Sequence, residues 1–358
     1  MTTTLLTRLD SDGDVLLSGP AVRAAAAGSD RVVVLAGPRG AAAARLLPGV
    51  DEVLVWHCPW IDAEPQPVDP DDVQRLVGTL RSHGIDRALV LTSFHQSPLP
   101  TALVLRLAGI PWVGATSEDF PGSLLDLRHR LPETGLHEAE RQLSLARAGG
   151  YELAPGDDDG LAVRSDLPDV THLTGDGPYV VVHPGASVPA RQPSVAWSAR
   201  LVASLSHAGH RVLVTGGPAE RALTAEVAAG AGAAFGPEGV TGPDVVDLGG
   251  ATDLAGLAAL LRGASCVVVG NTGPAHLAAA VRTPVVSLFS PVVPAERWRP
   301  WRVPHMLLGD QSSPCALSRA RACPIEGHPC LDDVPVEQAV DAVAQLIGRP
   351  VLNPGRWT

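Results

Sequence analysis

Lysine is missing from this sequence, so all 27 basic residues among its 358 residues are arginines. A phosphate-binding cluster must therefore use Arg, His, hydroxyl or backbone N–H groups, and Schiff-base chemistry on a lysine is excluded. Aromatic residues are scarce, at 4% of the chain. No apolar run approaches the roughly 18 consecutive residues of a membrane span. Five cysteines in so long a chain do not form the framework of a disulfide-stabilised protein.

Acidic residues outnumber basic ones by 38 to 27, which gives a formal net charge of −11. This balance argues against a general nucleic-acid binder. A hydrophobic content of 45% supports a large core, and the length fits two domains. The first ten residues lack the basic start and apolar stretch of a signal peptide. We therefore expect a protein of the cytoplasm, either free or at the inner face of the cytoplasmic membrane.

Short apolar runs rich in β-branched residues alternate with Ala- and Leu-rich helical segments. The runs that predict strands are Leu5–Leu9, Arg31–Ala36, Glu52–Trp56, Arg87–Thr92, Pro111–Gly114, Tyr179–His183, His210–Thr215, Val245–Leu248, Ser265–Val269 and Pro284–Phe289. Continuous apolar strands separated by helices indicate parallel sheets that are covered on both faces. The predicted fold class is α/β, with two doubly wound parallel-sheet domains facing a cleft.

The alternation is interrupted by a stretch rich in Gly, Pro and Asp between positions 149 and 178. We expect a first doubly wound domain over residues 1–150, a linker over 151–177, a second domain over 178–333, and a C-terminal helix and tail over 334–358. In open parallel sheets, ligands bind beyond the carboxyl ends of the strands. The loops that follow strands are therefore the candidate functional segments.

The loop after the first strand opens a helix predicted over Val15–Ala27. Asp14 is expected at the start of this helix, where the positive end of the helix dipole stabilises a carboxylate, and Gly13 permits a tight turn. A carboxylate that points into a cleft here could accept a proton from an attacking hydroxyl group. The alternative is that Asp10, Asp12 and Asp14 are solvated residues of a helix N-terminus, and spacing alone favours this alternative.

The loop after Tyr179–His183 contains Ser187 and, four residues later, Arg191. Backbone, hydroxyl and guanidinium donors in one loop could bind a phosphate group. The alternative is an ordinary connection between a strand and a helix, with Arg191 on the surface. The sequence leaves both interpretations open.

The loop after Ser265–Val269 opens another helix, in which Pro274 suits the first position. Asn271 or Thr272 is expected to cap this helix. The first N–H groups of the helix, with the helix dipole, make a natural pyrophosphate site, and His276 is expected to face the same opening. The alternative is a well-capped helix with a buried, hydrogen-bonded histidine.

A glycine-rich segment and a group of cysteines with one histidine resemble known binding motifs. Residues 230–236 resemble a glycine fingerprint but miss the GxGxxG spacing by one residue and follow a helix, which disfavours a nicotinamide-dependent oxidoreductase. Cys315, Cys323, His328 and Cys330 lack the close CxxC spacing of common zinc sites. We expect them to pack a loop, with a zinc site as the alternative.

Together these segments resemble glycosyltransferase family 9, the ADP-heptose:lipopolysaccharide heptosyltransferase group. The resemblance is carried by Leu9-Asp10-Ser11-Asp12-Gly13-Asp14-Val15, His183-Pro184-Gly185-Ala186-Ser187 with Arg191, Thr215-Gly216-Gly217-Pro218-Ala219-Glu220, and Thr272-Gly273-Pro274-Ala275-His276. It implies a GT-B fold of two Rossmann-like domains, with the acceptor bound by the first and the donor nucleotide by the second. It implies inverting transfer of a heptose or related sugar from a nucleoside diphosphate, expected to be ADP, to a hydroxyl of a glycan or glycolipid, with no metal and no cofactor.

The resemblance also implies a role for each candidate residue. Asp14 matches the general base, Glu220 a residue near the donor ribose, and Arg191 a basic residue on the sugar-phosphate side. The expected site residues are Asp14 for catalysis, Asp12 and Gly13 for the substrate loop, and Ser187, Arg191, Glu220, Asn271, Thr272, Gly273 and His276 for the donor.

Two positions depart from the family pattern. After the basic residue the family usually has an aromatic-Pro pair, where this chain has Gln192-Pro193. The family also usually has Asp where this chain has Asn271. The departure at Asn271 motivates a second hypothesis, a catalytically impaired sugar-nucleotide-binding protein of the same fold. Because Asn keeps the capping oxygen and drops the charge, Asn271→Asp is expected to change donor preference or turnover and to leave the thermal midpoint almost unchanged.

Overall fold

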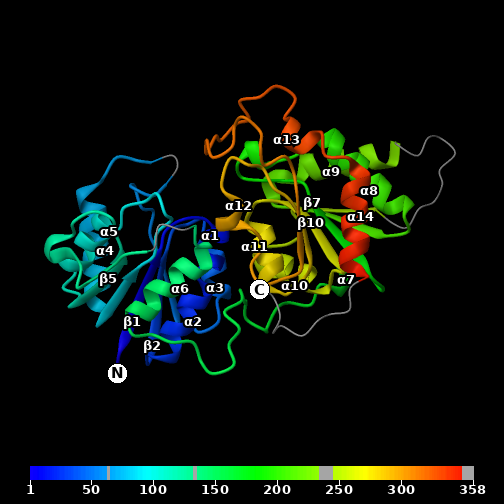
Figure 1. The fold of residues 1–358 in the computed structure, drawn as a ribbon. Coiled ribbons are helices and arrows are strands. Elements are labelled where there is room, and N and C mark those ends of the chain that lie inside the picture. The colour runs from blue at the N-terminus through cyan, green and yellow to red at the C-terminus, as the bar shows by residue number, and fades with distance from the viewer. Residues whose placement is uncertain (63–64, 132–134, 234–244, 349–358) are drawn as a thin grey trace. The chain divides into compact units, whose positions relative to one another are not determined.

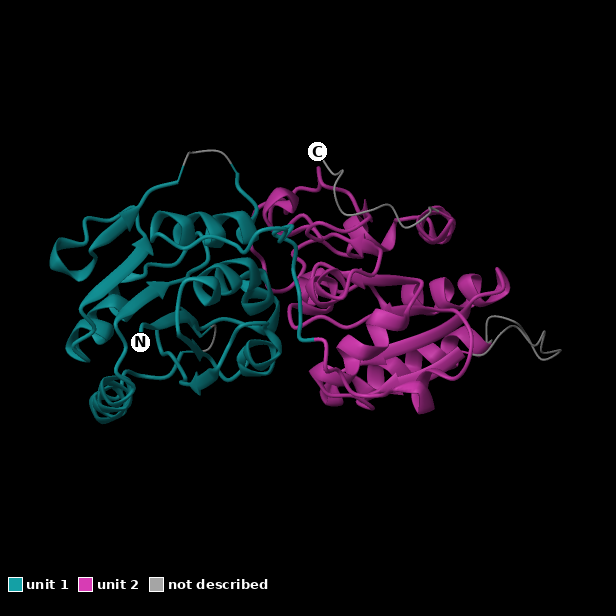
Figure 2. Cartoon of the chain, turned by 90° about the horizontal axis from the view of Figure 1, so that it is seen from below, with its two compact units in different colours: residues 1–164 teal, residues 165–358 magenta. Residues whose placement is uncertain are grey.

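The computed structural model describes residues 1–62, 65–131, 135–233 and 245–348. The chain divides into two compact units, residues 1–164 and 165–358 (Figure 2). This division falls within the segment 151–177, where the sequence places a linker. Each unit is a parallel sheet flanked by helices (Figure 1).

The first unit contains a six-stranded sheet of order β3-β2-β1-β4-β5-β6. Its strands are β1 (Thr3–Arg8), β2 (Arg31–Ala36), β3 (Glu52–Val55), β4 (Arg87–Val90), β5 (Trp112–Thr116) and β6 (Leu127–His129). All six residues of β1 are buried, and β1 pairs in parallel with both β2 and β4. Successive connections leave β1 in opposite directions here, so the carboxyl ends of β1 and β4 form the switch point at which such sheets bind ligands.

The helices of the first unit are α1 (Asp12–Leu17), α2 (Gly19–Ala27), α3 (Ala41–Leu46), α4 (Pro70–Ser82), α5 (Leu99–Leu107) and α6 (Glu138–Ala148). Helices α4 and α5 pack on one face of the sheet, and α2 and α6 pack side by side on the other (Figure 1). The prediction of a single helix over Val15–Ala27 is wrong. The chain forms α1 and α2 with Ser18 between them, because Pro20 lacks the N–H that would continue α1.

The second unit repeats this topology with the order β12-β11-β10-β7-β8-β9. Its strands are β7 (Tyr179–His183), β8 (Arg211–Gly216), β9 (Val245–Gly249), β10 (Cys266–Gly270), β11 (Val285–Leu288) and β12 (His305–Leu308). The strand β7 is equivalent to β1, so the switch point lies between the carboxyl ends of β7 and β10.

The helices of the second unit are α7 (Thr171–Thr174), α8 (Val195–His207), α9 (Arg221–Ala233), α10 (Leu254–Gly263), α11 (Gly273–Ala280), α12 (Ala295–Trp298), α13 (Pro329–Asp332) and α14 (Val336–Ile347). Trp197 on α8 is 1% exposed, and its indole Nε1 donates to the Val334 carbonyl at 2.7 Å. This contact fixes α8 to the segment that leads into α14. Across the described ranges, none of the helices combines the length and the apolar character needed to cross a membrane.

Candidate active site

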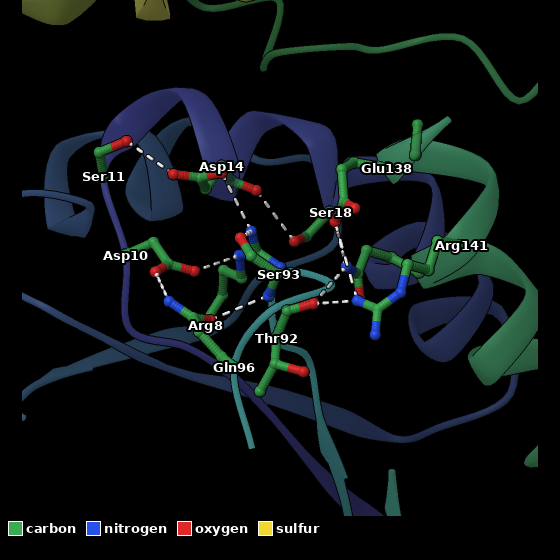
Figure 3. A network of polar contacts seen from close by, with 12 residues as sticks. Arg8, Asp10, Ser11, Asp14, Ser18, Thr92, Ser93, Gln96, Glu138 and Arg141 are labelled. Atoms are coloured by element: carbon green, nitrogen blue, oxygen red, sulfur yellow. Dashed lines mark hydrogen bonds and ion pairs between the residues drawn. The ribbon is translucent and has the colours of Figure 1, made fainter. Parts of the chain in front are cut away.

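A network of charged side chains lies at the carboxyl ends of β1 and β4 (Figure 3). Arg8, the last residue of β1, is 1% exposed. Its Nε lies 2.9 Å from Asp10 Oδ2, and its Nη2 lies 3.1 Å from Asp14 Oδ1. The same Nη2 donates to Ser93 Oγ at 2.8 Å. One buried guanidinium therefore connects two carboxylates of the first loop to the loop that follows β4.

Asp14 is held in a defined orientation and is still accessible. It lies in the first turn of α1, as predicted, and Ser11 Oγ donates to its Oδ2 at 2.9 Å. Its side chain is 24% exposed, compared with 11% for Asp10 and 1% for Arg8. A general base must be both oriented and reachable, and Asp14 is the member of this trio that best meets both conditions.

The loop after β4 forms a turn that is tied to this network. Gln96 N donates to the Ser93 carbonyl at 3.0 Å, and Ser93 N donates to Gln96 Oε1 at 2.9 Å. Gln96 Nε2 in turn donates to Asp10 Oδ1 at 2.6 Å. The turn presents Phe94 and His95, both exposed, at the carboxyl edge of the sheet.

Helix α6 adds a second buried ion pair behind the loop. Glu138 is fully buried, and its Oε2 lies 3.8 Å from Arg141 Nη1. Arg141 Nη1 and Gln142 Nε2 both donate to the carbonyl of Thr92, the residue before the turn. Together the network holds three carboxylates and two guanidinium groups, namely Asp10, Asp14 and Glu138 with Arg8 and Arg141.

Asp12 and Gly13, the expected substrate loop, face different surroundings. Asp12 Oδ1 accepts from Ala43 N at 3.0 Å, so its carboxylate turns toward α3. Burial raises the pKa of Asp12, and the Ala43 hydrogen bond partly opposes this shift. Gly13 is buried within α1. Gly40 packs closely against the loop after β1. A Cβ at this position would lie 2.9 Å from the Asp10 carbonyl oxygen, so glycine allows the two loops to approach each other.

In the second unit, His183 and Glu220 meet at the carboxyl ends of β7 and β8. His183 Nδ1 lies 3.0 Å from Thr215 Oγ1, and its Nε2 lies 3.7 Å from Glu220 Oε2. Gly217 N donates to Glu220 Oε2 at 2.7 Å. Burial lowers the pKa of His183, although the nearby Glu220 opposes this shift. A Cβ on Gly185 would overlap the Glu220 carboxylate, so only glycine leaves that carboxylate its place.

The third candidate loop leads from β10 into α11. Thr272 takes the N-cap position with an extended backbone, and Pro274 lies in the first turn. Thr272 and Gly273 are half-buried, whereas His276 is 5% exposed. The backbone of Arg191 also lies beside this loop. A Cβ added to Gly270 would be 2.6 Å from the Arg191 carbonyl oxygen. The structure thus brings the loop of Arg191 against the end of β10, while Ser187 in the same loop is exposed.

The prediction that Asn271 or Thr272 caps α11 is confirmed for the position of Thr272, but the Thr272 side chain makes no capping hydrogen bond. Asn271 is 4% exposed, its Nδ2 donates to the Ser290 carbonyl at 3.2 Å, and its Oδ1 accepts from Ser290 N at 3.1 Å. The amide of Asn271 therefore bridges the loops that follow β10 and β11. This pairing depends on a neighbouring strand, and no local pattern in the sequence signals it.

This bridge changes the expectation for Asn271→Asp. At neutral pH the new carboxylate would face the Ser290 carbonyl oxygen, and we expect the free energy of unfolding to fall by about 1–3 kcal/mol. A protonated carboxyl would again donate to that oxygen, so the loss should shrink as the pH falls. Chemical denaturation at about pH 5 and about pH 8 measures this difference, because a carboxyl titrates between these limits when buried. Asn271→Ala is the control, since it loses both bonds at either pH. A penalty for Asn271→Asp that is the same at both pH values would contradict the amide bridge.

The cysteine loop does not gather its polar side chains into a metal-binding group. Within the part of the chain that the structure describes, no set of three or more His, Cys, Asp or Glu side chains is arranged to hold a metal ion. Cys315 packs in an apolar cluster with Phe289 and Ala190. Burial raises the pKa of Cys330 to about 11, and the neighbouring thiols add to the shift.

The chain matches the sequence model of glycosyltransferase family 9 (heptosyltransferase) over residues 73–328, which is well over half of its length. It therefore belongs to this family. It is 28% identical over 249 residues to lipopolysaccharide heptosyltransferase 3 of Escherichia coli K12, a match that covers 64% of this chain and 65% of that relative.

Two solved structures from E. coli are similar over 97% of this chain. The ADP-heptose lipopolysaccharide heptosyltransferase II has a TM-score of 0.72 and 20% identity, with 98% of its chain covered. The heptosyltransferase WaaC with ADP has a TM-score of 0.64 and 19% identity, with 99% of its chain covered. The predicted GT-B fold, with two Rossmann-like units in one chain, is confirmed.

Sequence reasoning missed the residues that support Asp14. Arg8, Ser93, Gln96 and the Glu138–Arg141 pair were not among the candidates, although Arg8 contacts Asp14 directly. One signal was present in the sequence: Arg8 lies inside the apolar run Leu5–Leu9, and an arginine that is buried there needs a carboxylate partner.

Proposed function

We propose that this protein is a glycosyltransferase that moves a heptose or related sugar from a nucleoside diphosphate, with ADP as the expected nucleotide, to a hydroxyl of a glycan or glycolipid. The observation that carries the proposal is Asp14, an accessible carboxylate at the mouth of an otherwise buried charged network. Membership of family 9 and the similarity to a heptosyltransferase with ADP support it. We place the reaction in the cytoplasm, or at the inner face of the membrane where a glycolipid acceptor is presented.

Asp14 acts in this mechanism as the general base. Its carboxylate takes the proton of the acceptor hydroxyl, and the acceptor oxygen forms the new bond to the anomeric carbon of the donor sugar. The bond from that carbon to the diphosphate oxygen breaks, and its electron pair stays on the diphosphate. Attack opposite the leaving group inverts the configuration at the anomeric carbon.

The leaving diphosphate needs donors for its developing charge. We assign this role to the first N–H groups of α11, with Thr272, Gly273 and His276, and to Arg191 with Ser187. Asn271 holds the adjoining loop against Ser290. The chain contains no lysine, so guanidinium, imidazole and backbone groups supply this stabilisation without a metal in the proposed mechanism.

Glu220 is proposed to accept hydrogen bonds from the donor ribose. Its carboxylate accepts from Gly217 N and lies 3.7 Å from His183 Nε2, at the end of β7. A carboxylate in this position recognises the nucleoside independently of the phosphates. The two parts of the donor site therefore have separable effects on binding.

A second candidate is a sugar-nucleotide-binding protein without transfer activity, which the replacement of the usual Asp by Asn271 favours. The two candidates differ in turnover. The transferase releases ADP from ADP-heptose when an acceptor glycan is supplied, and the release depends on Asp14. A binding protein takes up ADP and produces none above the rate of the buffer blank.

Gly185→Ala is expected to weaken nucleoside binding about tenfold and to change the thermal midpoint little. The added methyl group would displace the Glu220 carboxylate, which is the end of a flexible side chain, so the fold itself is spared. Calorimetric titration with adenosine and with ADP measures the loss, which should be similar for both ligands. Gly217→Ala is the matched control, because a Cβ there would lie 3.6 Å from Glu220 Oε2, an ordinary contact distance. Equal affinities for the two variants would remove Glu220 from the nucleoside site.

A further inference from the structure

Arg8 lies between the carboxylates of Asp10 and Asp14, and its charge affects how strongly Asp14 can act as a base. A buried guanidinium 3.1 Å from Asp14 stabilises the ionised carboxylate and so opposes proton uptake. A carboxylate held by an arginine of its own would be a poor base. We propose that Asp10 is a positioning residue that keeps Asp14 basic by sharing Arg8 with it. This inference rests on the proposed role of Asp14, although its decisive test requires no turnover.

The geometry fixes Asp10 on Arg8. Asp10 Oδ2 lies 2.9 Å from Arg8 Nε, and Asp10 Oδ1 accepts from Gln96 Nε2 at 2.6 Å. Both carboxylate oxygens are therefore engaged, and the side chain is 11% exposed. Asp10 therefore lies against Arg8 as its largely buried counter-ion, whereas Asp14 presents its more exposed carboxylate to a ligand.

The charge balance supports this division of roles. Asp10, Asp14 and Glu138 contribute carboxylates to the network, and Arg8 and Arg141 contribute guanidinium groups. When Asp14 takes a proton, Arg8 keeps Asp10 and Arg141 keeps Glu138, so each buried arginine retains a carboxylate partner. An unpaired buried cation would be strongly destabilising. Proton uptake by Asp14 does not create one, because Arg8 and Arg141 keep their carboxylate partners.

Other groups around Asp14 do not replace Asp10. Ser11 and Ser93 supply neutral hydroxyls from the loops after β1 and β4. Asp12 on α1 turns toward α3, and Glu138 on α6 acts on Arg8 from behind. Arg39, from the loop after β2, favours the ionised form of Asp10 and also pairs with Asp62 at 3.5 Å. Burial raises the pKa of Asp10, Arg8 opposes this shift, and the charge of Asp14 adds to it.

The test is the titration of Asp14 followed by NMR of protein labelled with ¹³C at the aspartate carboxyl groups. Comparison with Asp14→Asn assigns the signal. In Asp10→Asn the titration midpoint of Asp14 should move to lower pH by about one pH unit, because a like charge is removed and Arg8 acts on Asp14 undivided. Asparagine has the same shape and can still accept from Gln96, although its Nδ2 then faces the Arg8 Nε donor. Asp10→Ser removes the charge without this contact between two donors.

Asp12→Asn is the matched control. It removes a carboxylate from the same loop, but this carboxylate is bonded to Ala43 N and makes no ion pair with Arg8. Its effect on the Asp14 midpoint should be less than half that of Asp10→Asn.

A midpoint that stays in place or rises in Asp10→Asn or Asp10→Ser would overturn the proposal. The acid limb of the pH profile for ADP release from ADP-heptose should shift by the same amount as the midpoint. A midpoint shift in a protein without turnover would preserve this inference and refute the proposed function, while turnover without a shift would do the reverse.

Discussion

Asp14→Asn is expected to lower the rate of sugar transfer by about 10²–10⁴-fold, the usual contribution of a positioned general base. Asparagine keeps the hydrogen bond from Ser11 and the place in the first turn of α1, but it cannot take the acceptor proton. Nucleoside diphosphate affinity should stay close to that of the native protein, because the proposed donor contacts all belong to the second unit. Measurement of ADP release from ADP-heptose, together with calorimetric titration of ADP, gives both quantities.

Asp12→Asn is the appropriate comparison for this variant. It removes a carboxylate from the same turn, but that carboxylate is bonded to Ala43 N. Any loss of rate should therefore be much smaller and should follow the loss of stability. Unchanged turnover in Asp14→Asn would return Asp14 to the role of a residue that only stabilises the start of α1.

Removing side-chain contacts at the start of α11 should separate phosphate binding from nucleoside binding. Thr272→Ala and His276→Ala are each expected to weaken ADP binding about 10- to 100-fold, the range for hydrogen bonds to charged groups. Adenosine binding should change little, since their proposed partners are phosphate oxygens at a helix N-terminus. Calorimetry with the two ligands measures the difference.

Two comparisons keep this result interpretable. Thr272→Ser retains the hydroxyl and should bind ADP almost as the native protein does. His276 is 5% exposed, so thermal unfolding of His276→Ala must be measured alongside to account for the cavity that the substitution leaves. Equal losses of ADP and adenosine affinity in both alanine variants would mean that the start of α11 does not face the phosphates.

The alternation of apolar runs and helical segments was sufficient to predict the two parallel sheets. Most strands lie within a residue or two of their predicted positions, as β7 at Tyr179–His183 illustrates. The edge strands β6 and β12 were missed because they are short and contain no β-branched residue, whereas the similarly short β3, β4 and β11 each contain valine. The break at Ser18 was also missed, although Pro20 marks it in the sequence.

The candidate site was predictable where it depends on local order. The position of Asp14 in the first turn of a helix after a buried strand follows from the sequence around it, and the structure has it there. The partners of Asp14 could not be predicted in the same way. Arg8 reaches Ser93 across 85 positions of sequence, and Asn271 pairs with Ser290 across the ends of two strands. Such contacts depend on which strands are neighbours, and periodicity does not supply that information.

Thermal unfolding in the presence of a panel of nucleoside diphosphates tests the central claim most directly. A ligand that binds the native state stabilises it by roughly 2.7 kcal/mol at one hundred times its dissociation constant, which is a readily measured shift. We predict that one nucleoside diphosphate, with ADP the foremost candidate, raises the thermal midpoint of the native protein and of Asp14→Asn alike, and raises that of Thr272→Ala much less. A midpoint that no member of the panel changes would contradict the account of the second unit as a nucleotide-sugar site.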